Sequence, residues 1–163
     1  MSFHGGLLGA LLALIWASRR YAIFLLDLTD FLAPLAPIGL FWGRIGNFIN
    51  QELYGRVSEV SWAVCFPLVD ELYRHPSQLY EALGEGLILG LALNLCRSCF
   101  LKRGQLTGAF LWGYGVLRIM SELFREPDWQ IGYLWYGTTL GELLSLPMIA
   151  LGSWLLMRGH LSS

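Results

Sequence analysis

The stretch GRIGNFINQELYGR, from Gly43 to Arg56, holds two arginines, one glutamate, two asparagines and three glycines between long apolar runs. The whole chain of 163 residues is 55% hydrophobic and 14% charged. Ordinary soluble domains carry roughly 25% charged residues. A polar stretch inside so apolar a chain predicts a set of side chains that face a protein interior or a watery cavity.

Composition places the chain among integral membrane proteins, because so few of its residues are charged. The formal net charge is -1, which gives no basic footprint for nucleic acid. A membrane-spanning helix needs about 20 apolar residues. We therefore predict an all-α, polytopic membrane protein, with residues 1–163 forming a single integral membrane domain. About five spans are expected, in Gly5–Ser18, Tyr21–Trp42, Leu79–Leu101, Gln105–Phe124 and Tyr133–Met157.

Two local features refine this architecture. Pro34 and Pro37 lie inside the second apolar segment, so its helix is expected to be kinked. Residues 57–74 are more polar and include VSEVSWAV, the densest β-branched pattern in the chain. Because β-branched residues favour strands, we expect a small extramembrane arm here, with a hairpin as one form that it can take.

The distribution of cations predicts the orientation. Six cations at one set of helix junctions have no acid beside them within their loops: Arg19, Arg20, Arg97, Lys102, Arg103 and Arg158. Such loops face the cytoplasm, so the N-terminus is predicted to lie outside. The polar groups then expected at the outer face are His4, Arg44, Glu52, Arg56, His75, Arg118, Glu122 and Arg125. Because several segments supply them, their convergence predicts a site.

The stretch GYGVLRIMSELFREPD carries a polar stripe. Tyr114, Arg118 and Glu122 are spaced by four, and Arg125 follows three residues later, so a helix places them on one face. A charge at the bilayer centre costs about 2.5–3.5 kcal/mol on insertion scales. The stripe is therefore expected to face an internal cavity. The alternative is an Arg–Glu pair that only ties helices together.

Arg44 and Asn47 are three residues apart and point the same way if the helix continues through them. Arginine suits bidentate recognition of phosphate, and a lipid headgroup offers a phosphate at this depth. The alternative is an arginine that anchors the chain at the interface by snorkelling.

Three further positions have two interpretations each. His4 stands at the outer end of the first apolar segment and has the side chain best suited to proton transfer near neutral pH. The alternative is an interfacial histidine without a chemical role. Glu81 and Glu85 share a helix face. They either belong to the polar convergence or simply favour the start of a helix.

Taken together, these stretches resemble one family, the bacterial prolipoprotein diacylglyceryl transferases. The motifs that carry the likeness are HGGLLGALLA, GRIGNFINQELYGR, RHPSQLYEALGEG, GYGVLRIMSELFREPD and LLSLPM, in the family's order. The resemblance implies transfer of a diacylglyceryl group from phosphatidylglycerol to the lipobox cysteine of a preprolipoprotein signal peptide. It also implies a multi-pass enzyme among the lipids of the bacterial inner membrane, with the site at the periplasmic face and with neither metal nor cofactor.

The resemblance also assigns roles to residues. Arg44 and Arg118 match arginines expected to hold the lipid phosphate, His4 matches an essential histidine, and Tyr114 matches a functional tyrosine. These four are the predicted catalytic residues, and the two arginines also belong to the predicted phosphatidylglycerol site. Asp30 matches an aspartate of the preceding helix. Motif positions expected to bind substrate or shape the site are Asn47, Glu52, Gly55 and Glu122.

The match also has departures. Family members carry roughly two membrane helices before the HGG motif, so the chain is expected to be truncated at its N-terminus. Gln51 stands where other members carry glycine, and Glu142 where many carry glutamine. The alternative function is therefore a catalytically inactive homologue that binds phospholipid or a partner chain. A transporter is disfavoured, because the polar groups cluster at one side.

Overall fold

The computed structural model describes residues 3–100, 102–126 and 140–161. Most of this chain is helical, as predicted. The helices are α1 (Phe3–Tyr21), α2 (Leu25–Leu32), α3 (Ala36–Ile49), α4 (Ser77–Glu81), the π-helix η1 (Ala82–Ile88), α5 (Leu89–Leu95), the 3₁₀-helix η2 (Arg97–Cys99), α6 (Gln105–Glu122) and α7 (Leu140–Leu161). Two short strands, β1 (Val64–Cys65) and β2 (Tyr73–Arg74), lie in the predicted arm.

The kink predicted in the second apolar segment is confirmed. The segment forms two helices, α2 and α3, which meet at an angle of 47°. Pro34 lies in the break and Pro37 in the first turn of α3. Because proline has no N–H and fixes its φ angle, it disfavours the interior of a helix and suits its first turn.

Within the described residues, no single helix is both long and apolar enough to cross a membrane. The bent pair of α2 and α3 meets the requirements of length and composition when its two parts are taken together. Residues 133–139 of the fifth predicted segment lie outside the described residues. The number of membrane spans therefore stays a prediction.

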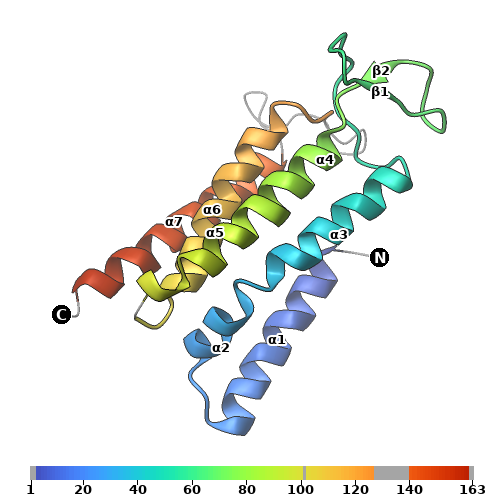
Figure 1. Cartoon of the computed structure of the whole chain (residues 1–163). Coiled ribbons are helices and arrows are strands. Elements are labelled where there is room, and N and C mark those ends of the chain that lie inside the picture. Colours follow the sequence, from blue (N-terminus) through green and yellow to red (C-terminus); the bar gives the residue numbers. More distant parts are fainter. Residues whose placement is uncertain (1–2, 101, 127–139, 162–163) are drawn as a thin grey trace.

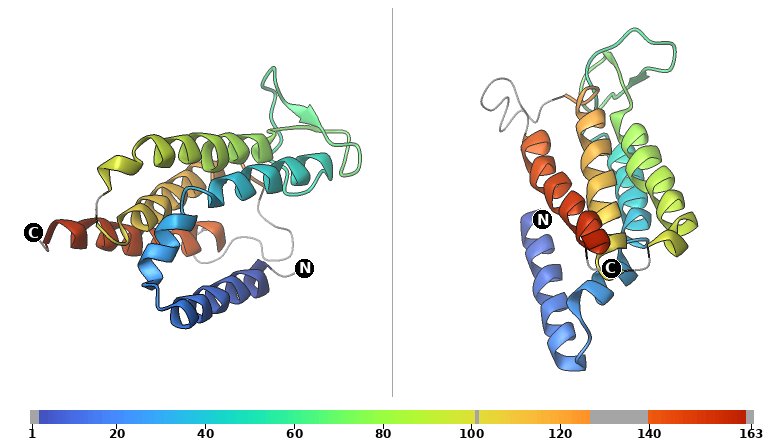
Figure 2. Two further views of the ribbon diagram at one scale, coloured as in Figure 1. Left: turned by 60° about the horizontal axis from the view of Figure 1, so that its bottom comes forward. Right: turned by 90° about the vertical axis from the view of Figure 1, so that its left-hand side faces the viewer.

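The longer helices lie side by side with the arm at one end (Figures 1 and 2). Helices α6 and α7 approach closely through small residues. A Cβ atom on Gly108 would lie 2.9 Å from the carbonyl oxygen of Gly152, and one on Gly115 would lie 2.7 Å from Ile149 Cγ1. Such small-residue contacts are typical of helix packing in membranes.

Helix α3 lies equally close to η1. A Cβ atom on Gly86 would lie 2.6 Å from Phe41 Cβ and 2.8 Å from Phe41 Cα. The π-helical segment η1 continues α4 and is continued by α5. Such segments inside α-helices are frequent at functional sites. Beside it, an apolar core joins α5 and α6 to the break before α3; its buried members are Ala33, Leu89, Leu93 and Leu106.

Asp30 ties α2 to the start of α6. Its carboxylate accepts hydrogen bonds from the backbone N–H groups of Gly104 at 2.6 Å and Thr107 at 2.7 Å, and from Thr107 Oγ1 at 2.6 Å. The first N–H groups of a helix have no partner within the helix. Asp30 therefore caps α6 from another helix.

The predicted arm contains a short hairpin, in which β1 and β2 pair antiparallel. Of the VSEVSWAV pattern, only the final Val64 lies in a strand. Arg74 holds the base of the arm, with Nη2 2.6 Å from Asp70 Oδ2 and the guanidinium 4.8 Å from the centre of the Tyr54 ring. The hydrogen bond from Arg74 keeps the pKa of Asp70 below its usual value.

The contact between α3 and η1 gives a first prediction. Gly86→Ala forces α3 away from η1, and we expect it to lower the free energy of unfolding by about 1–3 kcal/mol. Gly84→Ala is the matched control, because its nearest neighbour would be Leu117 Cδ2 at 3.6 Å. The control should be neutral or stabilise by about 0.5–1 kcal/mol. Thermal unfolding in detergent micelles measures both. Equal effects of the two substitutions would contradict the described packing.

Candidate active site

Two arginines, the buried Arg118 and the half-buried Arg44, meet on one glutamate. Arg44 comes from α3 and Arg118 from α6, while Glu81 is the last residue of α4. Arg44 Nε lies 2.7 Å from Glu81 Oε2, and Arg118 Nη1 lies 2.8 Å from Glu81 Oε1. The Glu81 side chain is fully buried. A single carboxylate thus bridges two helices that lie far apart in sequence.

Two further carboxylates complete this cluster, which we call the Arg–Glu cluster (Arg44, Glu81, Glu85, Arg118 and Glu122). Glu85 Oε2 lies 3.5 Å from Arg44 Nη2, and Glu85 Oε1 lies 4.0 Å from Arg118 Nη1. Glu122 Oε2 lies 3.0 Å from Arg118 Nη2. Three carboxylates therefore face two guanidinium groups in a buried environment, where unpaired charge is costly.

Hydrogen bonding in the cluster is incomplete. Arg118 Nη1 donates to Glu81 Oε1, and Arg44 Nη2 donates a long hydrogen bond to Glu85 Oε2. Glu81 Oε2 and Glu122 Oε2 form ion pairs with the arginines. Among the described residues, however, neither of these oxygens accepts an aligned hydrogen bond, and neither does Glu85 Oε1. Buried acceptors without donors cost free energy, so the three carboxylates are not fully satisfied by the arginines.

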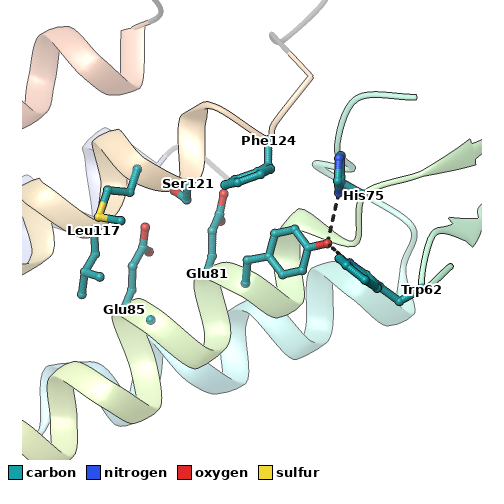
Figure 3. Close-up of a pocket in the computed structure, with 10 residues that line it drawn as sticks. Trp62, His75, Glu81, Glu85, Leu117, Ser121 and Phe124 are labelled. Carbon is teal, nitrogen blue, oxygen red and sulfur yellow. Dashed lines mark hydrogen bonds between the residues drawn. The ribbon is translucent and has the colours of Figure 1, made fainter. Parts of the chain in front are cut away.

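A pocket of about 460 Å³ borders the cluster, between the α4–η1 helix and α6. Figure 3 shows Glu81 and Glu85 pointing from their helix toward α6 beside this pocket. Apolar side chains supply much of its wall. Its lining residues are Trp62, His75, Tyr80, Glu81, Gly84, Glu85, Leu117, Met120, Ser121 and Phe124. A mostly apolar pocket with a few polar groups at one side is typical of small-molecule sites.

The arm reaches this pocket through Trp62, whose Nε1 donates a 2.7 Å hydrogen bond to the hydroxyl of Tyr80. The same hydroxyl lies 3.1 Å from Nδ1 of His75. The His75 and Tyr80 rings also pack edge to face against Phe124, at centroid distances of 5.4 and 5.6 Å. The arm, α4 and the end of α6 are thereby fixed relative to one another at one end of the pocket.

The predicted stripe on α6 is present for three of its four members. Tyr114, Arg118 and Glu122 lie in α6, and the latter two belong to the Arg–Glu cluster. Tyr114 stacks on Phe110 at 6.0 Å and packs against the apolar core. The placement of Arg125 on the same helical stripe was wrong, because α6 ends at Glu122. Arg125 instead forms an isolated β-bridge with Gly55.

Gly55 lies where three segments meet, and its position leaves no room for a side chain. A Cβ atom there would collide with the carbonyl oxygen of His75 and lie 2.7 Å from that of Phe124. Its N–H donates to His75 O at 3.0 Å, and the next residue, Arg56, donates from its N–H to Phe124 O at 2.9 Å. Gly55 therefore holds the arm against the end of α6.

For Asn47 and Glu52, the described residues show no side-chain contact to the cluster. Asn47 is half-buried on α3, one turn beyond Arg44. Glu52 is exposed, and its backbone carbonyl accepts a 2.7 Å hydrogen bond from Gln78 Nε2. His4 lies in the first turn of α1, and its side chain is outside what the structure describes. The chemical roles of these residues stay predictions.

Sequence reasoning left Glu81 and Glu85 between two interpretations, yet both lie at the centre of the cluster. The signal was available, because two acids four residues apart in an apolar segment require buried partners. Gly141 had no such signal. A Cβ atom there would lie 2.9 Å from Glu122 Oε1 and 3.1 Å from Arg118 Nη2. This glycine lets α7 approach the Arg118–Glu122 pair.

The fold and the cluster define a helical protein with a buried ionic site beside an apolar pocket. Comparison with known proteins gives its family. The family model for prolipoprotein diacylglyceryl transferase matches residues 1–158. The chain therefore belongs to the prolipoprotein diacylglyceryl transferase family.

Relatives named phosphatidylglycerol–prolipoprotein diacylglyceryl transferase support this membership. The relative from Polynucleobacter asymbioticus is 50% identical over 97% of this chain and 60% of its own length. That from Allorhizobium ampelinum is 55% identical over 98% of this chain and 57% of its own. The relative from Rickettsia rickettsii is 50% identical over 98% of this chain and 63% of its own length. The chain thus spans about 60% of the length of the relatives that it matches.

The burial of the cluster gives a second prediction. Arg118→Met leaves Glu81 and Glu122 without their shared partner, and we expect a loss of about 3–5 kcal/mol in the free energy of unfolding. Arg103→Met is the control, because the pair of Arg103 Nε and Asp27 Oδ1 at 2.9 Å is more than one-third exposed on both sides. The control should cost less than about 1 kcal/mol. Thermal unfolding in micelles distinguishes them; similar losses would argue against a buried cluster.

Proposed function

We propose that this chain takes part in the transfer of a diacylglyceryl group from phosphatidylglycerol to the lipobox cysteine of a preprolipoprotein. The observation that carries the proposal is the meeting of Arg44 and Arg118 on Glu81 beside an apolar pocket. Family membership and the printed names of the relatives supply the substrate class. The reaction makes a thioether and releases glycerol phosphate.

The two arginines are proposed to hold the phosphate of the lipid. A guanidinium group matches two phosphate oxygens at once. When the bond between the glyceryl carbon and the phosphate oxygen breaks, the electron pair of that bond leaves with glycerol phosphate. Positive groups fixed before the reaction stabilise such developing charge. Arg44 and Arg118 are already held in place by buried carboxylates, so little reorganisation is needed.

The nucleophile in this proposal is the thiolate of the lipobox cysteine. A free thiol has a pKa of about 8.5, so little thiolate is present at neutral pH. His4 is proposed as the base that takes the thiol proton, and the sulfur then forms its bond to the glyceryl carbon. Tyr114, one turn from Arg118, is proposed as the second functional group near the reacting atoms. These roles rest on the family's motif positions.

Four motif residues complete the proposed site. Glu122 positions Arg118 through their ion pair at 3.0 Å. Gly55 holds the arm against the end of α6. Asn47 and Glu52 lie on the arm side of Arg44, at the end of α3 and in the loop that follows. We propose that these two contact the lipid headgroup.

A second candidate is binding without catalysis. The observation that favours it is the pairing of Arg44 and Arg118 on one anionic group, which accounts for phosphate binding without any chemical step. In that case the Arg–Glu cluster still recognises the phosphate of phosphatidylglycerol, but no thioether forms. Purified chain that binds phosphatidylglycerol vesicles and leaves a lipobox peptide unmodified would support this candidate over the transferase.

We further propose that residues 1–163 form one multi-pass domain of the bacterial inner membrane, with the arm on the periplasmic side. This orientation is supported by the predicted cytoplasmic cations, which lie at helix ends far from the arm (Figure 1). These ends are the C-terminus of α1, the segment from η2 to the start of α6, and the C-terminus of α7. The Arg–Glu cluster then lies toward the outer half of the bundle.

This orientation predicts the result of a reporter fusion. Alkaline phosphatase, which is active only in the periplasm, should be silent when it is fused after Arg158, because that junction is predicted to be cytoplasmic. A fusion inserted in the arm after Glu59 is the control and should be active. Strong activity after Arg158 would overturn the proposed orientation.

The transfer reaction gives the functional prediction. Arg118→Lys keeps the charge but loses the fork that contacts Glu81 and Glu122 together. We expect the rate of thioether formation on a synthetic lipobox peptide in phosphatidylglycerol vesicles to fall about 10²-fold, as when one stabilising donor is removed. Mass spectrometry measures the modified peptide. Arg103→Lys is the matched control and should keep the wild-type rate, and an unimpaired Arg118→Lys variant would contradict the proposal.

The same assay tests the proposed base. His4→Gln should lower the transfer rate about 10²–10⁴-fold near neutral pH. The deficit should shrink as the pH rises toward 8.5, because the thiolate then forms without a base. A deficit that stays constant between about pH 6.5 and 9 would show that His4 is not the base for the thiol.

A further inference from the structure

We propose that Glu81 occupies the place of the lipid phosphate between Arg44 and Arg118, so that the phosphate binds by displacing its carboxylate. This inference rests on the proposed function, because it assumes that the two arginines receive a phosphate. It assigns to Glu81 a role beyond tying helices together. Glu81 is a positioning residue that keeps the empty site assembled and competes with the ligand.

In the bridge, one anionic group is shared by two guanidinium groups. Glu81 presents one carboxylate oxygen to each arginine, at 2.7 Å to Arg44 Nε and 2.8 Å to Arg118 Nη1. Two oxygens of one phosphate make the same kind of bridge between two guanidinium groups. The two arginines are therefore already spaced to share one anionic group.

Charge balance requires an exchange. Glu81, Glu85 and Glu122 already present three carboxylates to the two arginines. Adding a phosphate without displacing any of them would crowd four acidic groups around two arginines in a buried site, where like charges repel strongly. Displacing the central carboxylate avoids this crowding at the arginines.

The remaining contacts let the arginines keep their positions after the exchange. Arg44 retains Glu85 at 3.5 Å, and Arg118 retains Glu122 at 3.0 Å. Glu81 is the member that contacts both arginines at less than 3 Å. Its displacement therefore frees both arginines for one new anion while each keeps a carboxylate that fixes its orientation.

The pocket beside the cluster offers space for the displaced Glu81 side chain. Glu81 lines the pocket of about 460 Å³ between α4–η1 and α6, with Ser121 among the polar lining residues. Within the part of the chain that the structure describes, its Oε2 atom accepts no aligned hydrogen bond, although it lies 2.7 Å from Arg44 Nε. An oxygen held so imperfectly is a weaker competitor than a well-bonded one.

Lipid binding to the purified chain tests the proposal. The chain is placed in nanodiscs of phosphatidylcholine, and the affinity for added fluorescent phosphatidylglycerol is measured. Glu81→Gln keeps the size of the side chain and removes its negative charge. The glutamine side chain no longer makes a charge-assisted bond to the arginines, so it competes less strongly with the phosphate. Phosphatidylglycerol should therefore bind about tenfold more tightly. Glu85→Gln is the matched control and should change the affinity much less, since its contacts are 3.5 and 4.0 Å.

The outcomes separate this inference from the proposed function. Unchanged or weaker binding by Glu81→Gln, with binding lost in Arg118→Met, would overturn the displacement and leave the phosphate site intact. Equal tightening by both glutamine variants would also overturn it, because the effect would then be general repulsion. If the wild type and Arg118→Met bind phosphatidylglycerol equally well, the phosphate site fails and this inference fails with it.

If Glu81→Gln folds poorly, a second variant tests the same proposal. Glu81→Asp keeps the negative charge but is one methylene shorter, so it cannot reach both arginines from the same backbone position. It too should bind phosphatidylglycerol more tightly than the wild type. An affinity equal to or below that of the wild type would overturn the proposal.

Discussion

The pairing of two guanidinium groups with three buried carboxylates constrains how four elements of this structure pack. Arg44, Arg118 and their partners come from α3, α4, η1 and α6, so these elements must be held within a few ångströms of one another. Removing one member of such a cluster leaves a buried charge without compensation. The close approaches of α3 at Gly86 and of α7 at Gly141 are compatible with this condition, and neither contact leaves room for a side chain.

The arm depends on the same arrangement. Two backbone hydrogen bonds fix its base: the N–H of Gly55 donates to the carbonyl of His75, and the N–H of Arg56 donates to the carbonyl of Phe124. It is fixed above the pocket by the hydrogen bond from Trp62 to Tyr80, in the same helix turn as Glu81. A segment of mixed polarity thereby becomes part of the wall beside the ionic cluster. In the proposed reaction, this wall borders the position of the lipid headgroup.

The sequence predicted the features that follow from local chemistry. Apolar runs indicated the helices, Pro34 and Pro37 indicated the break before α3, and four-residue spacing placed Arg118 and Glu122 on one face. It did not choose between pairing and helix initiation for Glu81 and Glu85, because their partners lie on other helices. The position of Arg125 off the helical stripe also escaped prediction, since a pairing of Arg125 with Gly55 fixes the chain there. Long-range contacts of this kind leave little trace in local spacing.

The central claim is that Arg44 and Arg118 bind one lipid phosphate together. Solid-state NMR measures it directly, through the dipolar coupling between ³¹P of phosphatidylglycerol and the ¹⁵N-labelled side chains of arginine. Charge-assisted hydrogen bonds place the phosphorus within about 4 Å of the guanidinium nitrogens. The account predicts strong coupling to two arginines, with Arg44→Lys and Arg118→Lys each removing one of the two signals. Coupling that survives both substitutions, or none in the wild-type chain, would contradict it.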